Sequence, residues 1–166
     1  MKDSQTAGLA DQSRIDPLRR PECARGTDTA TPPVALLSNG RYGVVITAAG
    51  SGCSTWRGLD VTRWREDATR DCWGQFCYIQ DPTEGTAWSA GYQPVCRAPI
   101  SYEVVYSADK AEFRRLDGAI ATHLAITVSP ENCCEIRRVT LTNHDTRPHD
   151  VELTSYAEVE IGRAHV

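Results

Sequence analysis

Tryptophan and arginine side chains are concentrated in one stretch of this sequence, residues 37–94. All four tryptophans lie within it: Trp56, Trp64, Trp73 and Trp88. Their neighbours are arginines, acids and glycines, as in TRWRED at 62–67. Aromatic faces stack on the C–H faces of sugar rings, and guanidinium and carboxylate groups bind sugar hydroxyls. This mixture of residue types therefore favours a saccharide-facing surface over a sheet built only for stability.

Two segments of this stretch supply the candidate saccharide contacts. In an extended segment Arg63, Arg65 and Asp67 alternate along the chain and share one face. That face offers two guanidinium forks and a carboxylate for hydroxyl groups. The second segment places aromatic faces at the edge of a glycine-containing turn and contributes Trp88, Tyr92 and Gln93. A purely structural alternative exists for both segments, with Arg63 and Asp67 as an ion pair that pins loops and Trp88 in the core.

A self-contained catalytic site is not expected, so no residue is predicted to be catalytic. Glycoside hydrolysis needs two carboxyl groups that face each other about 5–9 Å apart. Glu66 and Asp67 would point to opposite faces of one strand, and Glu158 and Glu160 lie on the polar side of an amphipathic strand. The sequence has no GxSxG elbow, and the AAGSG segment at 48–52 lacks the ending of a phosphate-binding loop. We expect that segment to be only a turn.

The cysteines do not predict a metal site or a disulfide framework. They are odd in number, two are adjacent, and none forms a C-x2-C pair: Cys23, Cys53, Cys72, Cys77, Cys96, Cys133 and Cys134. Three histidines could complete a metal site, but nothing in the sequence places His123, His144 and His149 together. We therefore expect ordinary thiols, no metal and no cofactor.

Length and charge limit the possible classes of protein. A chain of 166 residues is about one domain long, and 18 basic against 22 acidic residues argue against nucleic-acid binding. No apolar run approaches the roughly 20 residues needed to cross a bilayer. The N-terminus lacks the apolar segment of a secretory signal, so a cytoplasmic location is expected.

Short β-branched and aromatic runs between turn residues predict an all-β, antiparallel β-sandwich. The expected strands are residues 44–47, 76–80, 101–106, 112–116, 119–128 and 134–142, with a last strand from 151. Residues 81–85 should form a turn, and Asp117-Gly118 fits a two-residue type I′ hairpin turn.

The apolar pattern also assigns faces to three of the strands. In 119–128 one face carries Ile120, Thr122, Leu124, Ile126 and Val128. In 134–142 the apolar residues fall out of phase, which indicates either a β-bulge at Arg137-Arg138 or two covered faces. The last strand should point inward with Val151, Leu153, Ala157 and Val159 and outward with Glu152, Thr154, Glu158 and Glu160.

Three segments are expected along the chain. Residues 1–33 end in Thr-Pro-Pro and have the composition of a linker or disordered arm. Residues 34–160 should form the carbohydrate-binding sandwich. Residues 161–166 read IGRAHV, which a common sequencing adapter encodes, so we expect a non-native tail and an incomplete fragment of a sandwich.

Several motifs together resemble one family. They are LLSNGRYG at 36–43, TAAGSG at 47–52, TRWRED at 62–67 and WSAGYQP at 88–94, continued by SYEV at 101–104 and LTSYAE at 153–158. This set resembles the amino-terminal β-sandwich of glycoside hydrolase family 94, formerly glycosyltransferase family 36. It is most similar to the phosphorylase-like region of cyclic β-1,2-glucan synthases. The resemblance covers residues 34–160, and the cysteines are not part of it.

The resemblance implies a supersandwich that precedes an (α/α)6 barrel. In such enzymes inorganic phosphate, as co-substrate, attacks a β-glucoside with inversion, and a barrel aspartate protonates the leaving oxygen. The implied partners are a β-glucan, the C-terminal barrel of a parent chain and a second copy in a homodimer. Contact with nucleic acid or membrane is not expected for this segment, although the parent could lie at the cytoplasmic face of the inner membrane. The rival hypothesis is a stand-alone carbohydrate- or protein-binding sandwich module with no enzymatic role.

Overall fold

The only regular secondary structure in the described residues is the β-strand. The computed structural model describes residues 14–15, 34–65 and 71–160. Every pair of neighbouring strands is antiparallel. The largest sheet has the order β1 (Arg14–Ile15), β8 (Ser101–Tyr106), β9 (Lys110–Asp117), β10 (Ile120–Val128) and β11 (Glu135–Asn143). The prediction of an all-β, antiparallel fold is confirmed.

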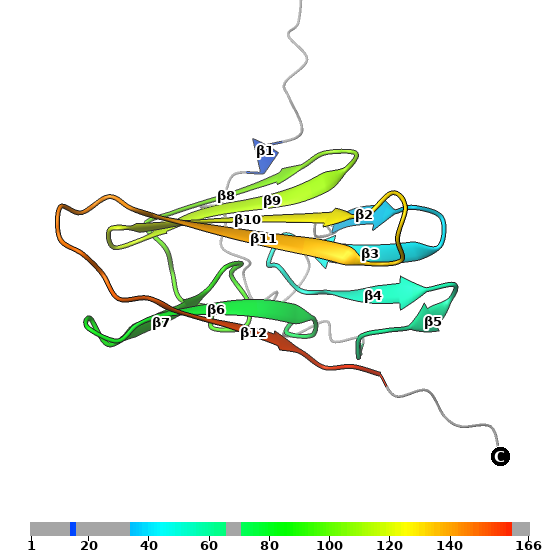
Figure 1. The fold of residues 1–166 in the computed structure, drawn as a ribbon, viewed down its shortest axis with the longest axis horizontal. Helices are drawn as coiled ribbons and strands as arrows, with labels where there is room; N and C mark the ends of the chain where they lie inside the picture. The colour runs from blue at the N-terminus through cyan, green and yellow to red at the C-terminus, as the bar shows by residue number, and fades with distance from the viewer. Residues whose placement is uncertain (1–13, 16–33, 66–70, 161–166) are drawn as a thin grey trace, which may run out of the picture.

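Two smaller sheets complete the sandwich. One has the order β12 (Glu152–Ala157), β6 (Gln75–Asp81) and β7 (Thr86–Ser89). The other has the order β2 (Val34–Ser38), β3 (Tyr42–Thr47), β4 (Gly52–Trp56) and β5 (Leu59–Asp60). In Figure 1 the five-stranded sheet is one layer, β6, β7 and β12 lie opposite it, and the β2–β5 sheet lies at one end.

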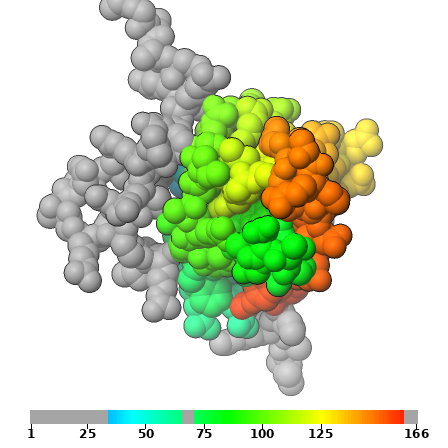
Figure 2. Space-filling model, turned by 90° about the vertical axis from the view of Figure 1, so that its left-hand side faces the viewer, coloured from blue at the N-terminus to red at the C-terminus, as the bar shows by residue number. Residues whose placement is uncertain are grey.

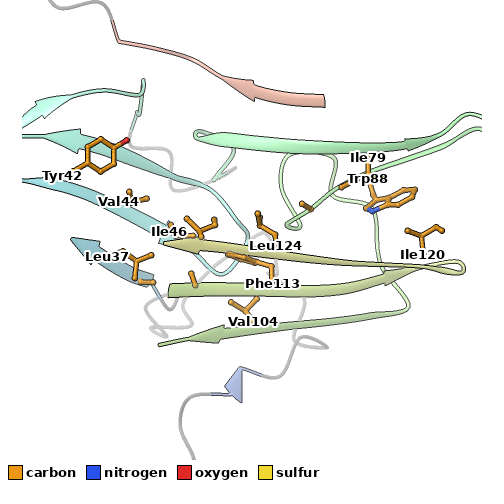
Figure 3. Packing of buried hydrophobic residues seen from close by; sticks show 14 residues of the cluster. Leu37, Tyr42, Val44, Ile46, Ile79, Trp88, Val104, Phe113, Ile120 and Leu124 are labelled. Carbon is orange, nitrogen blue, oxygen red and sulfur yellow. The ribbon is translucent and has the colours of Figure 1, made fainter. Parts of the chain in front are cut away.

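The core lies between these sheets and draws on all of them. Phe113, Leu124 and Ile126 come from the five-stranded sheet, and Val44 and Ile79 from the other two. Figure 3 shows Val44, Ile79, Phe113 and Leu124 among the side chains that lie between the layers. Burial of this kind is the dominant stabilising term, about 25 cal/mol per Å² of apolar surface.

The predicted faces of β10 and β11 have different outcomes. The inward face of β10 is confirmed, because Ile120, Leu124 and Ile126 are buried. The β-bulge in β11 is wrong, since β10 and β11 pair residue by residue from Ile120–Asn143 to Val128–Glu135. The apolar pattern of β11 is out of phase because a charged side chain occupies an inward position. Arg137 points inward, half-buried, and donates to Glu135 at 3.0 Å and to the carbonyl of Gln75 at 2.7 Å.

The β9–β10 hairpin is where the sequence predicts it, but its turn is shifted by one residue. Asp117 pairs with Ile120, so Gly118 and Ala119 form the two-residue turn. The φ angle of Gly118 is +56°, whereas that of Ala119 is not positive. A positive φ at the first turn residue alone is typical of a type II′ turn rather than type I′. Asp117 stays in the strand because its buried carboxylate binds Arg115.

The predicted inward face of the last strand is wrong for Leu153, Ala157 and Val159, which are exposed, whereas Val151 is half-buried and packs against the core. All six residues of β12 are exposed, and Leu153 is 54% exposed although it lies beside the fully buried Ile79. β12 is the edge strand of its sheet. No layer of described residues covers its side chains, so the amphipathic alternation of its sequence does not lead to burial. The two polypeptide ends fall largely outside the described residues: 161–166 entirely, and 1–33 except for β1, which pairs with Val104 and Val105. Within the described part, no helix is long and apolar enough to cross a membrane.

Candidate functional site

Three connecting segments contact one another through backbone hydrogen bonds and form what we call the loop cluster. They are the β3–β4 turn (48–51), residues 71–74 before β6, and the β7–β8 connection (90–100). The backbone N–H groups of Tyr92 and Gln93 both donate to the carbonyl of Ala49, at 3.0 and 2.9 Å. Gly52 N–H donates to the carbonyl of Trp73 at 2.9 Å. The TAAGSG and WSAGYQP motifs, far apart in sequence, are therefore in direct contact.

Glycine makes this contact possible. A Cβ atom on Gly91 would lie 3.0 Å from the carbonyl oxygen of Ala49 and 3.1 Å from Cα of Gly50. Gly50 also has φ +90°, a conformation that other residues rarely adopt. The two glycines thus allow the backbones of the β3–β4 turn and the β7–β8 connection to touch. The prediction that AAGSG is a turn is confirmed, with Gly50 N–H donating to Thr47 O at 2.9 Å.

Asp71 joins the third segment to the β3–β4 turn. Its carboxylate accepts a hydrogen bond from the Thr47 hydroxyl at 2.7 Å, and its carbonyl accepts one from the Ser51 hydroxyl. Asp71 has φ +46°, the left-handed region that aspartate tolerates better than most residues. Its carboxylate therefore serves the loop cluster as an acceptor.

Tyr92 and Gln93 lie in the loop cluster, half-buried. The ring of Tyr92 meets that of Tyr102 edge to face, with centroids 6.5 Å apart. The Tyr102 hydroxyl donates to the carbonyl of Ala48 at 2.8 Å, and burial raises the pKa of this phenol far above its ordinary value. Tyr102 is therefore a neutral, fixed donor beneath Tyr92.

Arg65 also reaches this cluster. Its guanidinium lies 5.6 Å from the ring centroid of Trp73, within the range of a cation–π contact. Arg65 is exposed, and Trp73 is half-buried beside Gly52. Together they place a guanidinium over an indole face next to the β3–β4 turn.

Arg63 has a different environment. Its guanidinium lies 3.7 Å from Glu158 and 3.4 Å from Glu160, just after β12. The backbones of these segments pair as well, through the Thr62–Val159 bridge. Arg63 therefore forms ion pairs with these two acids, whereas the structural alternative named Asp67 as its partner. Asp67 lies outside the described residues.

The prediction that Trp88 faces a saccharide is wrong. Trp88 is 1% exposed and lies between β7 and β10, where Figure 3 shows it among core side chains. Its indole N–H donates to the hydroxyl of Thr122 at 3.1 Å, so its polar atom is satisfied inside. A buried tryptophan with a paired N–H has no surface to offer a ligand. The core alternative for Trp88 is confirmed.

The loop cluster contributes an indole, a guanidinium, phenols, an amide, the Asp71 carboxylate and backbone carbonyls. Among the residues that the structure describes, no three His, Cys, Asp or Glu side chains come together as metal ligands. The described cysteines are free thiols, and burial raises the pKa of Cys53 and of Cys77, which keeps both protonated near neutral pH.

The candidate site residues chosen from the sequence did not include Asp71, Trp73 or Arg115. Trp73 belongs to the tryptophan-rich stretch, but nothing local separates it from Trp88. The only signal for Arg115 is that it shares a strand face with Phe113 and Asp117, an arginine and an aspartate in an otherwise apolar row. Asp71 carries no sequence signal, because its role depends on backbone geometry.

Comparison with known proteins agrees with the resemblance inferred from the motifs. The chain is 42% identical, over 124 residues, to the cyclic beta-(1,2)-glucan synthase NdvB of Rhizobium meliloti (strain 1021), covering 74% of the chain and 4% of that protein. It is 32% identical over 88 residues to a 3-O-beta-D-glucopyranosyl-beta-D-glucuronide phosphorylase of Paenibacillus borealis, covering 53% of the chain and 11% of the relative. An N,N'-diacetylchitobiose phosphorylase of Vibrio furnissii is 26% identical over 137 residues, covering 79% of the chain and 17% of the relative.

The chain therefore spans only a small part of the length of these relatives. The sequence model of the family described as "Glycosyl hydrolase 94, supersandwich domain" matches residues 21–165, most of the chain. This match and the antiparallel strands described above lead to one assignment: the chain belongs to the glycosyl hydrolase 94 supersandwich domain family.

Proposed function

We propose that this chain is the saccharide-contacting sandwich of a larger enzyme, a cyclic β-1,2-glucan synthase or a β-glucoside phosphorylase, and is inactive alone. The observation that carries the proposal is the loop cluster, where Arg65 lies over the ring of Trp73 and where Tyr92 and Gln93 are hydrogen-bonded to the β3–β4 turn. An indole with an adjacent guanidinium suits a sugar ring and its hydroxyls. The names of the relatives make a β-linked glucan the first ligand to try.

In the parent enzyme, the sandwich would cover the catalytic (α/α)6 barrel and take part in a homodimer. Exposed apolar side chains support such packing, because Leu36 is 71% and Val159 is 64% exposed. Phosphate would act as the parent's co-substrate at the barrel. A cytoplasmic location of the parent stays a prediction.

A saccharide titration tests the binding part of this proposal. We expect a β-1,2-glucan oligosaccharide at millimolar concentration to shift the NMR signals of Arg65, Tyr92 and Gln93 in the isotope-labelled chain. Arg65→Ala should weaken these shifts. Arg147→Ala, whose side chain is 76% exposed on the β11–β12 connection, is the matched control and should leave them unchanged. The absence of any shift at saturation would contradict the binding role.

An activity assay tests the second part. Incubated with phosphate and the same glucan, the chain alone should release no sugar phosphate, because in this proposal the catalytic acid and the phosphate site belong to the barrel. Measurable release would contradict the proposal that catalysis needs the barrel.

A protein-binding module without enzymatic role is the second candidate, favoured by the exposed apolar residues Leu36 and Leu153. It predicts no saccharide shifts, and loss of a protein contact when these residues are changed to threonine.

A further inference from the structure

The side chain of Arg115 lies buried beneath the loop cluster, where it binds one carboxylate and three backbone carbonyls. The side chain of Arg115 is 0% exposed, and its carboxylate partner Asp117 is 2% exposed. Nε and Nη2 donate to the two carboxylate oxygens at 2.6 and 2.7 Å. Burying a charged pair in this way seldom adds stability over an apolar pair, so another role is expected.

The remaining donors of Arg115 reach the last residue of β7 and the β7–β8 connection. Nη1 donates to the carbonyls of Ser89, at 2.8 Å, and Gly91, and Nη2 donates to the carbonyl of Arg97 at 3.2 Å. A guanidinium has five N–H donors in a rigid fork, and here all five have acceptors. Three of these acceptors are carbonyls from both ends of one irregular segment.

The fork therefore holds the two ends of the β7–β8 connection and leaves its middle at the surface. Between these ends the chain carries Tyr92 and Gln93, whose N–H groups bind Ala49 from the other side. The connection is thus fixed between a guanidinium beneath it and the β3–β4 turn beside it. Tyr92 and Gln93 have no regular secondary structure to orient them otherwise.

We propose that Arg115 is a positioning residue, which sets the conformation of residues 89–97 so that Tyr92 and Gln93 can contact the saccharide. It touches no ligand itself. The role in saccharide contact rests on the proposed function; the ordering of the connection does not. Lysine cannot replace arginine here, because one ammonium group cannot reach five acceptors in a plane.

Amide hydrogen exchange in Arg115→Lys tests the ordering role in the intact 166-residue chain. We expect the amides of Tyr92, Gln93, Val95 and Cys96, all hydrogen-bonded in the wild type, to exchange at least about tenfold faster. Amides of the β10–β11 pair should keep their wild-type rates. Unchanged protection at residues 92–96 would overturn the proposal.

Arg137→Lys is the matched control. Arg137 is also partly buried, and it likewise binds a carboxylate two residues away, Glu135, and a backbone carbonyl. A merely structural arginine lowers the melting temperature without a local effect, so Arg137→Lys should leave exchange at 92–96 unchanged. Equal loosening of this connection in both variants would show a global effect and overturn the proposal.

Saccharide binding separates this inference from the proposed function. With the β-1,2-glucan oligosaccharide as ligand, Arg115→Lys should weaken affinity at least about fivefold well below its melting temperature, and Arg137→Lys should not. If the wild type does not bind, the proposed function fails while the exchange result still decides whether Arg115 orders the connection. If Arg115→Lys loosens the connection but binds as well as the wild type, the positioning role is overturned.

Discussion

The region beneath the loop cluster and the β11–β12 margin, formed by the edge strands β11 and β12, differ in how far they bury their side chains. Beneath the loop cluster the side chain of Arg115 is fully buried, and all its donors are paired. At the β11–β12 margin, Leu153 is 54% exposed although it sits beside Ile79, which is 0% exposed. The two residues share a register and a face. The difference teaches that strand pairing orients a side chain, whereas burial requires a layer opposite it.

The largest expected effect concerns the interior near Trp88. Trp88→Ala should lower the free energy of unfolding by about 3–5 kcal/mol, because it leaves a cavity and removes the partner of the Thr122 hydroxyl. Trp64→Ala, at a side chain 51% exposed, should change it by only about 0.5 kcal/mol. Denaturant unfolding measures both. Similar losses in the two variants would mean that Trp88 is not part of the core.

The second prediction compares the register partners directly. Ile79→Ala should cost about 2–5 kcal/mol, because this side chain is enclosed by the core. Leu153→Ala should cost less than about 1 kcal/mol in this chain, since the side chain is half-exposed. Urea titrations of the two variants measure the difference. A cost at Leu153 equal to that at Ile79 would show that the β11–β12 margin is closed in solution.

The third prediction concerns the close contact between Gly91 and the β3–β4 turn in the loop cluster. Gly91→Ala should destabilise by about 1–3 kcal/mol, because its methyl group would press on the backbone of Ala49 and Gly50. Gly43→Ala in β3 is the control, with its Cβ at an ordinary 3.4 Å from Thr55, and should be neutral or slightly stabilising. Thermal melts compare the two. If Gly91→Ala is also neutral, the two backbones do not touch as described.

The smallest expected effect concerns pH at the β11–β12 connection. Figure 2 shows this connection against the β6–β7 hairpin. His149 lies between two carboxylates, with Nδ1 at 2.9 Å from Asp81 and Nε2 at 3.4 Å from Asp145. These hydrogen bonds, that of Asp81 first, raise the pKa of His149. Arg147, on the same connection, binds the carboxylate of Asp145 at 3.2 Å.

The direction of the pH dependence of stability follows from whether each group binds its proton more tightly in the folded or in the unfolded state. The contribution of His149 is complete below the ordinary histidine pKa of about 6.5 and is lost as pH rises through the raised value. Backbone N–H donors and His149 lower the pKa of Asp81, and His149 first among its partners lowers the pKa of Asp145 to about 2. Their contribution is therefore complete above the ordinary aspartate pKa of about 3.9 and is lost as pH falls through the lowered values.

Melting temperatures across pH check this prediction. Wild type should exceed His149→Gln most between about pH 4 and 6.5, and the gap should narrow at higher pH. His144→Gln, at an exposed histidine of the same connection, should follow the wild-type profile. A difference in melting temperature between wild type and His149→Gln that does not vary with pH would contradict a protonated His149 bound between the two carboxylates.

Much of the fold could be predicted from local pattern, and less of the site. The strand at 101–106 was predicted with its observed bounds, and the inward face of β10 follows from its alternation. In the site, Tyr92, Gln93 and Arg65 lie at the loop cluster, but Trp88 does not. The local sequence around Trp88 and around Trp73 does not say which of the two side chains is buried. Only long-range packing places one beneath β10 and the other beneath Arg65.

The sequence by itself determined the antiparallel β class, the position of the β9–β10 hairpin to within one residue and the family, because these depend on alternation, turn residues and motif identity. The tertiary structure decided which tryptophan is buried, that β12 is exposed on both faces, and that Arg115 is sealed against Asp117. Alternation specifies which side chains share a face. It does not specify whether another layer covers that face, since that depends on segments distant in the sequence.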